Sequence, residues 1–128
     1  MIRHLEVVAF VEDDIALREA LVELLKAAGF RTLSFGSGLD LLGSADLHLI
    51  DCLVSDVGLP GINGFVLRQR LGAARPEMPV ILITGERALL ELDQHDVSRP
   101  GTILSKPFDG SELLKAVEVA LAARRSSR

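Results

Sequence analysis

The chain has 128 residues, of which 48% are hydrophobic, and its formal net charge of −4 argues against nucleic acid as a direct partner of this segment. This length suits one domain with a substantial core, and the single cysteine, Cys52, excludes an internal disulfide and fits a reducing compartment. No apolar run approaches a membrane span and the N-terminus lacks a signal-peptide layout, so we expect a cytoplasmic protein without a membrane partner.

Apolar strands and amphipathic helices alternate from the N-terminus. Residues 5–11, LEVVAFV, form a continuous apolar run, which is typical of a strand buried on both faces. In residues 14–29, leucines at three- and four-residue spacing predict a helix that ends at Gly29. Residues 30–35 predict a second strand, and Ser37 is the expected N-cap of a short helix.

The second half of the chain repeats this alternation. Three further strands are expected, at residues 49–56, 79–84 and 102–106. Between the first two of these, a helix capped by Asn63 stops before Pro76. A strong final helix opens at Asp109 or Ser111.

This order predicts an α/β protein with a parallel sheet covered by helices on both sides. Right-handed crossovers leave few topologies, and a doubly wound sheet of five strands is the simplest. We expect one domain over residues 1–124, with residues 125–128 as a frayed tail or a linker stub.

Polar residues gather where the expected strands end, and parallel strands all end at the same edge of a sheet. The residues at these strand ends are Glu12, Asp13 and Asp14, then Asp56, then Thr84 and Gly85, then Lys106 and Pro107. Asp14 is best explained as a helix cap. The remaining acids repel one another, so Lys106 or a divalent cation must offset their charge. Oxygen ligands alone suit Mg²⁺, and a carboxylate beside a metal, a lysine and a hydroxyl suits phosphoryl transfer.

Four motifs in this order resemble the response-regulator receiver domain of bacterial two-component signalling. They are the Glu12–Asp13 pair, SDVGLPGING at 55–64, ILITG at 81–85 and SKPF at 105–108. Each motif is weak alone, but the set covers nearly the whole chain and is specific. The resemblance implies a flavodoxin-like sheet of order 2-1-3-4-5 with five helices.

The resemblance also implies a role for each site residue. Asp56 would accept a phosphoryl group from a phosphohistidine, Thr84 would bond the new phosphoryl oxygen, and Lys106 would pair with it. Magnesium would be held by Glu12, Asp13, Asp56 and the backbone carbonyl of Gly58. The bond between Lys106 and Pro107 is expected to be cis, which only a following proline makes plausible.

The partners implied are a sensor histidine kinase or a phosphotransfer protein, and an output domain or a target protein. Phosphorylation would switch the face formed by helix four, strand five and helix five, so the domain signals rather than acting as an independent enzyme. A homodimer is a further open expectation.

Two segments depart from the family pattern. Ile103 stands where the family often has an aromatic residue whose rotamer follows activation. Residues 86–101, ERALLELDQHDVSRPG, turn polar after Leu92, so we expect a short or irregular fourth helix there.

Alternatives remain open at this point. The chain could be a degenerate receiver that only binds proteins, or a hydrolase with an aspartate nucleophile, although Gly58 stands where that class usually has a second acid. Asp56 could be a turn residue and Thr84 a plain strand residue. Structural roles are expected for Cys52 in the core, for His4, His48 and His95 at the surface, and for Arg124, Arg125 and Arg128 as partners of a helix dipole.

Overall fold

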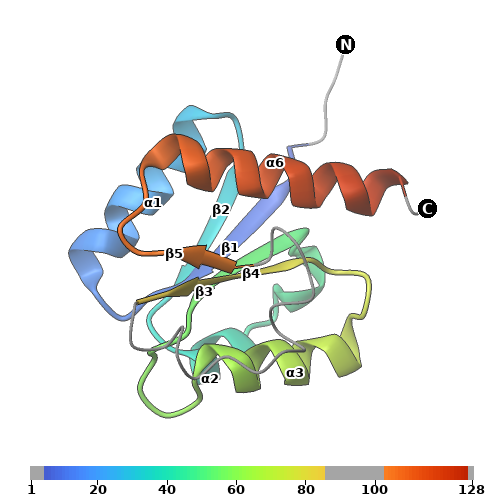
Figure 1. Ribbon diagram of the computed structural model, residues 1–128. Coiled ribbons are helices and arrows are strands. Elements are labelled where there is room, and N and C mark those ends of the chain that lie inside the picture. Colours follow the sequence, from blue (N-terminus) through green and yellow to red (C-terminus); the bar gives the residue numbers. More distant parts are fainter. Residues whose placement is uncertain (1–4, 86–102, 127–128) are drawn as a thin grey trace.

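A computed structural model describes residues 5–85 and 103–126, and its centre is one parallel sheet (Figure 1). The five strands have the order β2-β1-β3-β4-β5, which confirms the predicted fold. Their bounds are β1 Val7–Val11, β2 Arg31–Phe35, β3 Cys52–Asp56, β4 Val80–Thr84 and β5 Ile103–Ser105.

Helices cover both faces of this sheet, with α1 and α6 on one side and α2 and α3 on the other (Figure 1). Their bounds are α1 Ile15–Ala27, α2 Gly38–Leu42, α3 Gly64–Ala74 and α6 Gly110–Ser126. The predicted fourth helix falls within residues 86–102, outside the described residues. In the described part of the chain, no helix has both the length and the apolar character that crossing a bilayer needs.

Alternate residues of each central strand supply two separate cores. In β1, Val8 and Phe10 pack with α1 and α6, while Ala9 and Val11 pack with α2 and α3. All of β1 is buried, because both of its faces meet helices. This explains the continuous apolar run in the sequence.

Side-chain caps set the start of all four described α-helices. In α2 the amide of Asp40 donates to Oγ of Ser37 at 3.1 Å, which confirms the predicted cap. The amides of Leu17, Val66 and Glu112 donate to the side-chain oxygens of Asp14, Asn63 and Asp109, at 3.1, 3.0 and 3.0 Å. Asp109 rather than Ser111 therefore opens the last helix. Gly29 follows α1 with φ of 98°, a conformation that glycine adopts without strain.

The third strand is shorter than predicted, because it begins at Cys52 and not at residue 49. Residues Leu47–Leu49 form a short 3-10 helix instead. Arg75 explains the difference, since its Nη1 donates to the carbonyls of Leu47 and Ile50 at 3.0 and 2.6 Å. These bonds hold the segment outside the sheet. At the other end of the chain, α6 continues to Ser126, and the boundary at residue 124 stays a prediction.

Candidate functional site

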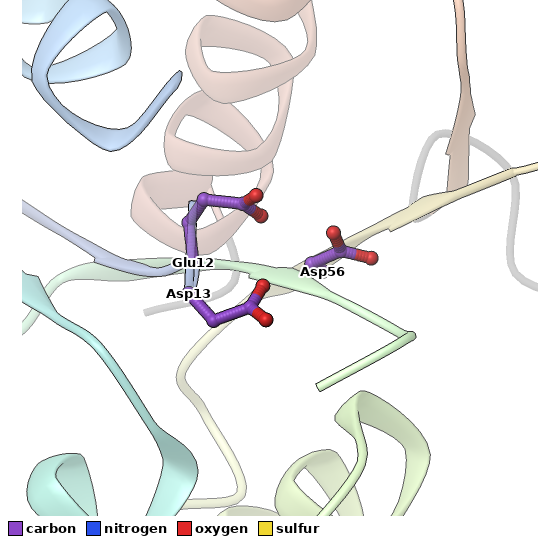
Figure 2. Close-up of side chains that lie close together, drawn as sticks. All are labelled: Glu12, Asp13 and Asp56. Carbon is purple, nitrogen blue, oxygen red and sulfur yellow. The ribbon is translucent and has the colours of Figure 1, made fainter. Parts of the chain in front are cut away.

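Three acids meet at the edge where the strands end (Figure 2). Glu12 and Asp13 follow β1, Asp56 ends β3, and these strands are neighbours in the sheet. One carboxylate oxygen from each acid lies within 4.8 Å of the others. The topology thus brings together residues that are more than forty positions apart in the sequence.

Lys106 provides a positive charge at this cluster. Its Nζ lies 2.9 Å from Oδ2 of Asp56, and the amide of Gly58 donates to Oδ1 at 3.0 Å. Burial raises the pKa of Asp56, but these hydrogen bonds outweigh burial and the net pKa lies below its usual value. Burial likewise opposes the charge of Lys106, and the bond to Asp56 outweighs it, so the Lys106 pKa is raised. Asp56 is therefore an ionised carboxylate at neutral pH.

Glu12 behaves differently from Asp56. Its side chain is buried, with 4% of the residue exposed. Burial, followed by the hydrogen bond and the charge of Asp56, raises the Glu12 pKa to about 7. A proton thus stays on Glu12 to about neutral pH, because burial and the neighbouring Asp56 carboxylate both disfavour the charged form. Asp13, in contrast, is exposed.

Thr84 ends β4 and is 0% exposed. Among the described residues, its hydroxyl oxygen has no hydrogen-bond partner. Thr84 lies beside Ser105 in the sheet, and its carbonyl accepts from the amide of Lys106 at 2.8 Å. A buried hydroxyl without a partner is uncommon and is expected to serve a ligand or a second state.

The loop after Asp56 packs tightly against α3. A Cβ at Gly64 would lie 2.7 Å from the carbonyl oxygen of Asp56 and 2.9 Å from Cα of Val57, so only glycine permits this approach. The bond between Lys106 and Pro107 is cis, which confirms that prediction. The role of the Gly58 carbonyl as a metal ligand stays a prediction.

Arg18 also lies at this edge, although no sequence pattern predicted it. Its Nη1 donates to the carbonyl oxygen of Glu12 at 3.0 Å. A contact between a side chain and a backbone oxygen leaves no pattern in a single sequence, so no motif could have identified it.

Predictions outside the cluster have mixed outcomes. Cys52 is a buried free thiol whose pKa burial raises to about 12, which fits a core role. His48 is exposed as expected, whereas His4, His95 and Arg128 lie outside the described residues. Ile103 packs partly buried against the core on the side of α2 and α3.

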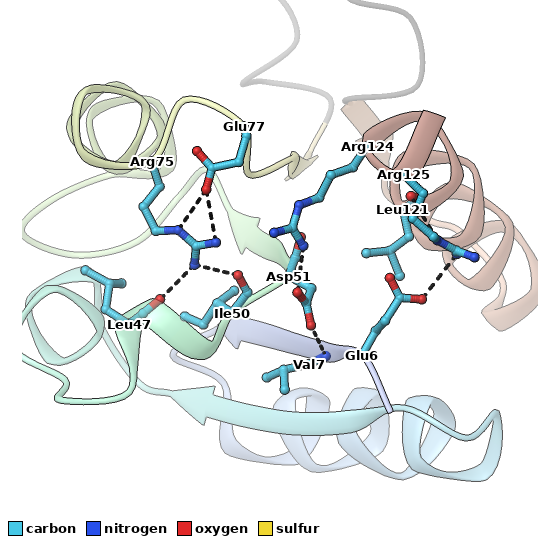
Figure 3. Close-up of polar contacts among 10 residues, drawn as sticks. All are labelled: Glu6, Val7, Leu47, Ile50, Asp51, Arg75, Glu77, Leu121, Arg124 and Arg125. Carbon is cyan, nitrogen blue, oxygen red and sulfur yellow. Dashed lines mark hydrogen bonds and ion pairs between the residues drawn. The ribbon is translucent and has the colours of Figure 1, made fainter. Parts of the chain in front are cut away.

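Arg124 and Arg125 lie in the last turn of α6, as expected of partners of the helix dipole, and Nε of Arg125 donates to the carbonyl oxygen of Leu121 at 3.2 Å. Both also form ion pairs that the sequence did not predict. Arg124 Nη1 lies 2.6 Å from Oδ1 of Asp51, and Arg125 pairs with Glu6 at 3.2 Å (Figure 3). Both bonds join the end of α6 to the start of the sheet. The topology places these acids beside α6, and local charge patterns do not reveal that.

Comparison with known proteins agrees with this geometry. The family model of the response regulator receiver domain matches residues 8–118. Nodulation protein W of Bradyrhizobium diazoefficiens is 35% identical over 95% of this chain and 54% of its own length. Transcriptional regulatory protein CreB of Escherichia coli is 34% identical over 91% and 51%. Response regulator receiver protein CpdR of Brucella abortus is 28% identical over 91% and 97%.

Solved structures give the same result for the fold. A receiver domain protein from Clostridium thermocellum has a TM-score of 0.87 at 20% identity, covering 97% of this chain and 100% of its own. The response regulator StyR has a TM-score of 0.82 at 31% identity, covering 98% and 65%.

The fold and the acidic edge define a signalling domain of the two-component class. The chain belongs to the response-regulator receiver domain family, whose standard function is phosphorylation-dependent switching. It spans about half the length of Nodulation protein W and CreB.

Proposed function

We propose that Asp56 accepts a phosphoryl group from a phosphohistidine of a sensor histidine kinase or a phosphotransfer protein. The position of the Asp56 carboxylate carries this proposal. Its Oδ2 lies 2.9 Å from Lys106 Nζ, and the acidic side chains of Glu12 and Asp13 lie beside it at the same edge. An ionised carboxylate next to a cation is the group that can attack phosphorus at neutral pH.

In the transfer step, an oxygen of Asp56 forms a bond to phosphorus while the bond between phosphorus and the imidazole nitrogen breaks. The electron pair of that bond stays on the imidazole nitrogen, and the ring, which carries a proton from solvent on its other nitrogen, leaves as neutral imidazole. In the proposal Lys106 pairs with a phosphoryl oxygen, and its contact with the attacking carboxylate supports this role.

The donor set fits Mg²⁺. The cluster offers carboxylate oxygens only, from Glu12, Asp13 and Asp56, and hard divalent cations prefer oxygen ligands. We include the Gly58 carbonyl as a further ligand. When bound, Mg²⁺ would offset negative charge on the phosphoryl oxygens. Glu12 would have to release its proton to join this set, because its pKa is about 7.

Thr84 is our candidate for the group that senses phosphorylation. Its buried hydroxyl has no partner among the described residues, and we propose that it donates to a phosphoryl oxygen on Asp56. The gain of that bond would favour a second packing of the face that includes β5 and α6.

We propose that the protein is a cytoplasmic switch that controls an output domain or a target protein. It would catalyse its own phosphorylation and dephosphorylation and no independent metabolic reaction. We also propose that two copies of the chain pair through the face that includes β5 and α6.

Incubation with acetyl phosphate and Mg²⁺, followed by intact mass measurement, tests the proposal. The wild type should gain the mass of one phosphoryl group, and chelation of Mg²⁺ should prevent the gain. Asp46→Asn should gain the same mass as the wild type, because Asp46 is exposed and caps no helix through its side chain. An unmodified wild type would instead favour a module that binds proteins independently of phosphorylation, and turnover of phosphate esters would favour a hydrolase.

A further inference from the structure

Arg18 of α1 connects three segments at the acidic edge. Its Nη1 donates to the carbonyl oxygen of Glu12 at 3.0 Å, just after β1. The same atom lies against Gly36, just after β2, where an added Cβ would be 2.8 Å away. The guanidinium therefore lies between the ends of two neighbouring strands, in contact with the backbone of Glu12 and close to Gly36.

The Glu12 carbonyl has a particular need for this donor. The amide of Glu12 donates to Phe35 at 3.1 Å, which continues the parallel ladder one step beyond β1. In the next step of a parallel ladder, the amide of Ser37 would donate to the Glu12 carbonyl. Ser37 is instead the N-cap of α2, where the chain turns away from the sheet. Arg18 supplies the donor at the point where the ladder stops.

We infer that Arg18 is a positioning residue for the cation site. The bond it makes orients the peptide between Glu12 and Asp13, and this peptide sets the directions of both carboxylates. Among the described residues, Arg18 forms no ion pair with a carboxylate, so it acts through backbone geometry and not by neutralising an acid. This inference rests on the proposed function, because it assigns the supporting residue of the proposed Mg²⁺ site.

Titration of the unphosphorylated protein with Mg²⁺, followed by calorimetry, tests the inference without any activity measurement. Arg18→Met keeps the apolar stem and removes the donors, and we expect about tenfold weaker Mg²⁺ binding, as is usual for residues that hold metal ligands. Arg18→Lys retains one donor group and should recover part of the loss. Arg70→Met, on the exposed side of α3, should bind like the wild type.

Gly36→Ala provides an independent second variant. Its methyl group would push the flexible end of Arg18 away from Glu12, so we expect roughly threefold weaker Mg²⁺ binding. In the Arg18→Met background the methyl group meets no guanidinium, and the second substitution should then have no effect. Such non-additivity is the signature of a shared contact.

The outcomes separate the two proposals. If the wild type binds Mg²⁺ and Arg18→Met binds within about twofold of it, the positioning role is overturned and the proposed site stands. If the wild type binds no Mg²⁺, both fail. Should Arg18→Met not fold, Gly36→Ala decides: weaker binding supports the inference and unchanged binding overturns it.

Discussion

Strand β3 has an acid at each end, and the two acids have different surroundings. Asp51 precedes the strand, at the edge opposite the acidic cluster. Its Oδ1 accepts from Arg124 at 2.6 Å and its Oδ2 accepts from the amide of Val7 at 2.8 Å (Figure 3). Beside this pair, Glu6 faces Arg125. Two acids thus meet two arginines, and charge at this edge is balanced.

Asp56 ends the same strand in unbalanced surroundings. Two further acids lie within 4.8 Å, and Lys106 is the cation that contacts the cluster among the described residues. Burial of Glu12, together with the hydrogen bond and the charge of Asp56, raises the Glu12 pKa and keeps a proton on it to about pH 7. Similar side chains therefore form ion pairs across the fold at one edge and form the proposed cation and phosphoryl site at the other. Local charge balance and the burial of Glu12 distinguish the two edges.

Replacing Asp56 or Asp51 by asparagine should give the largest difference between the two ends of β3. Asp56→Asn removes the proposed nucleophile, so phosphoryl uptake from acetyl phosphate should be lost completely. Asp51→Asn should retain uptake, because it weakens only contacts at the opposite edge, with Arg124 and with the amide of Val7. Intact mass measurement of both variants checks this. Uptake by Asp56→Asn would assign the acceptor to another residue.

The charge excess should also appear in the pH dependence of stability. The Glu12 pKa is about 7 in the folded protein and near 4.5 in the unfolded chain. Between these values the folded state binds more protons, so stability without Mg²⁺ falls as pH rises and stays low above about pH 7. The lowered Asp56 pKa acts in a separate window, because the stability it gives is lost as pH falls below 3.8.

Glu12→Gln should remove this slope. At about pH 8 the variant should be more stable than the wild type by about 2 kcal/mol in urea unfolding. Glu23→Gln, on the exposed side of α1, should keep the slope. A wild-type stability that is constant between about pH 5 and about pH 8 would contradict the unbalanced cluster.

The balanced edge should respond to the loss of a single arginine. Arg124 has a side chain only 10% exposed, so Arg124→Met should lower the free energy of unfolding by about 2 kcal/mol. Arg125→Met should lower it by less than about 1 kcal/mol, because that side chain is 58% exposed. Urea unfolding at one pH measures both. Equal losses of unfolding free energy in the two variants would mean that burial does not make the Arg124–Asp51 pair stronger than the Arg125–Glu6 pair.

A smaller effect than that of Arg124→Met, and of opposite sign, is expected at Thr84. Its hydroxyl is buried without a partner among the described residues, so Thr84→Val should raise stability by about 1 kcal/mol. Ser55→Ala is the matched control, since the buried Ser55 hydroxyl donates to the Asp56 carbonyl at 3.1 Å and its loss should lower stability. A destabilised Thr84→Val would mean that the hydroxyl is already bonded in the unmodified protein.

Much of the site could be predicted because strand ends can be read from local sequence. Glu12, Asp56 and Lys106 each follow an apolar run, and the ends of parallel strands share one edge. The ion pair of Asp51 with Arg124 could not be predicted, because its partners are 73 residues apart and no motif joins them. Asp51 even lay inside the predicted third strand, since Ile50 and Leu49 continue its apolar pattern.

By itself, the sequence determined the order of strands and helices and the residues at each strand end, because hydrophobic periodicity and helix caps are local properties of the chain. The tertiary structure alone decided which charges are balanced, how deeply Glu12 is buried, and that the Thr84 hydroxyl has no partner in the described residues. These properties depend on distances between segments remote in sequence. Electrostatic and desolvation energies depend on those distances and not on position along the chain.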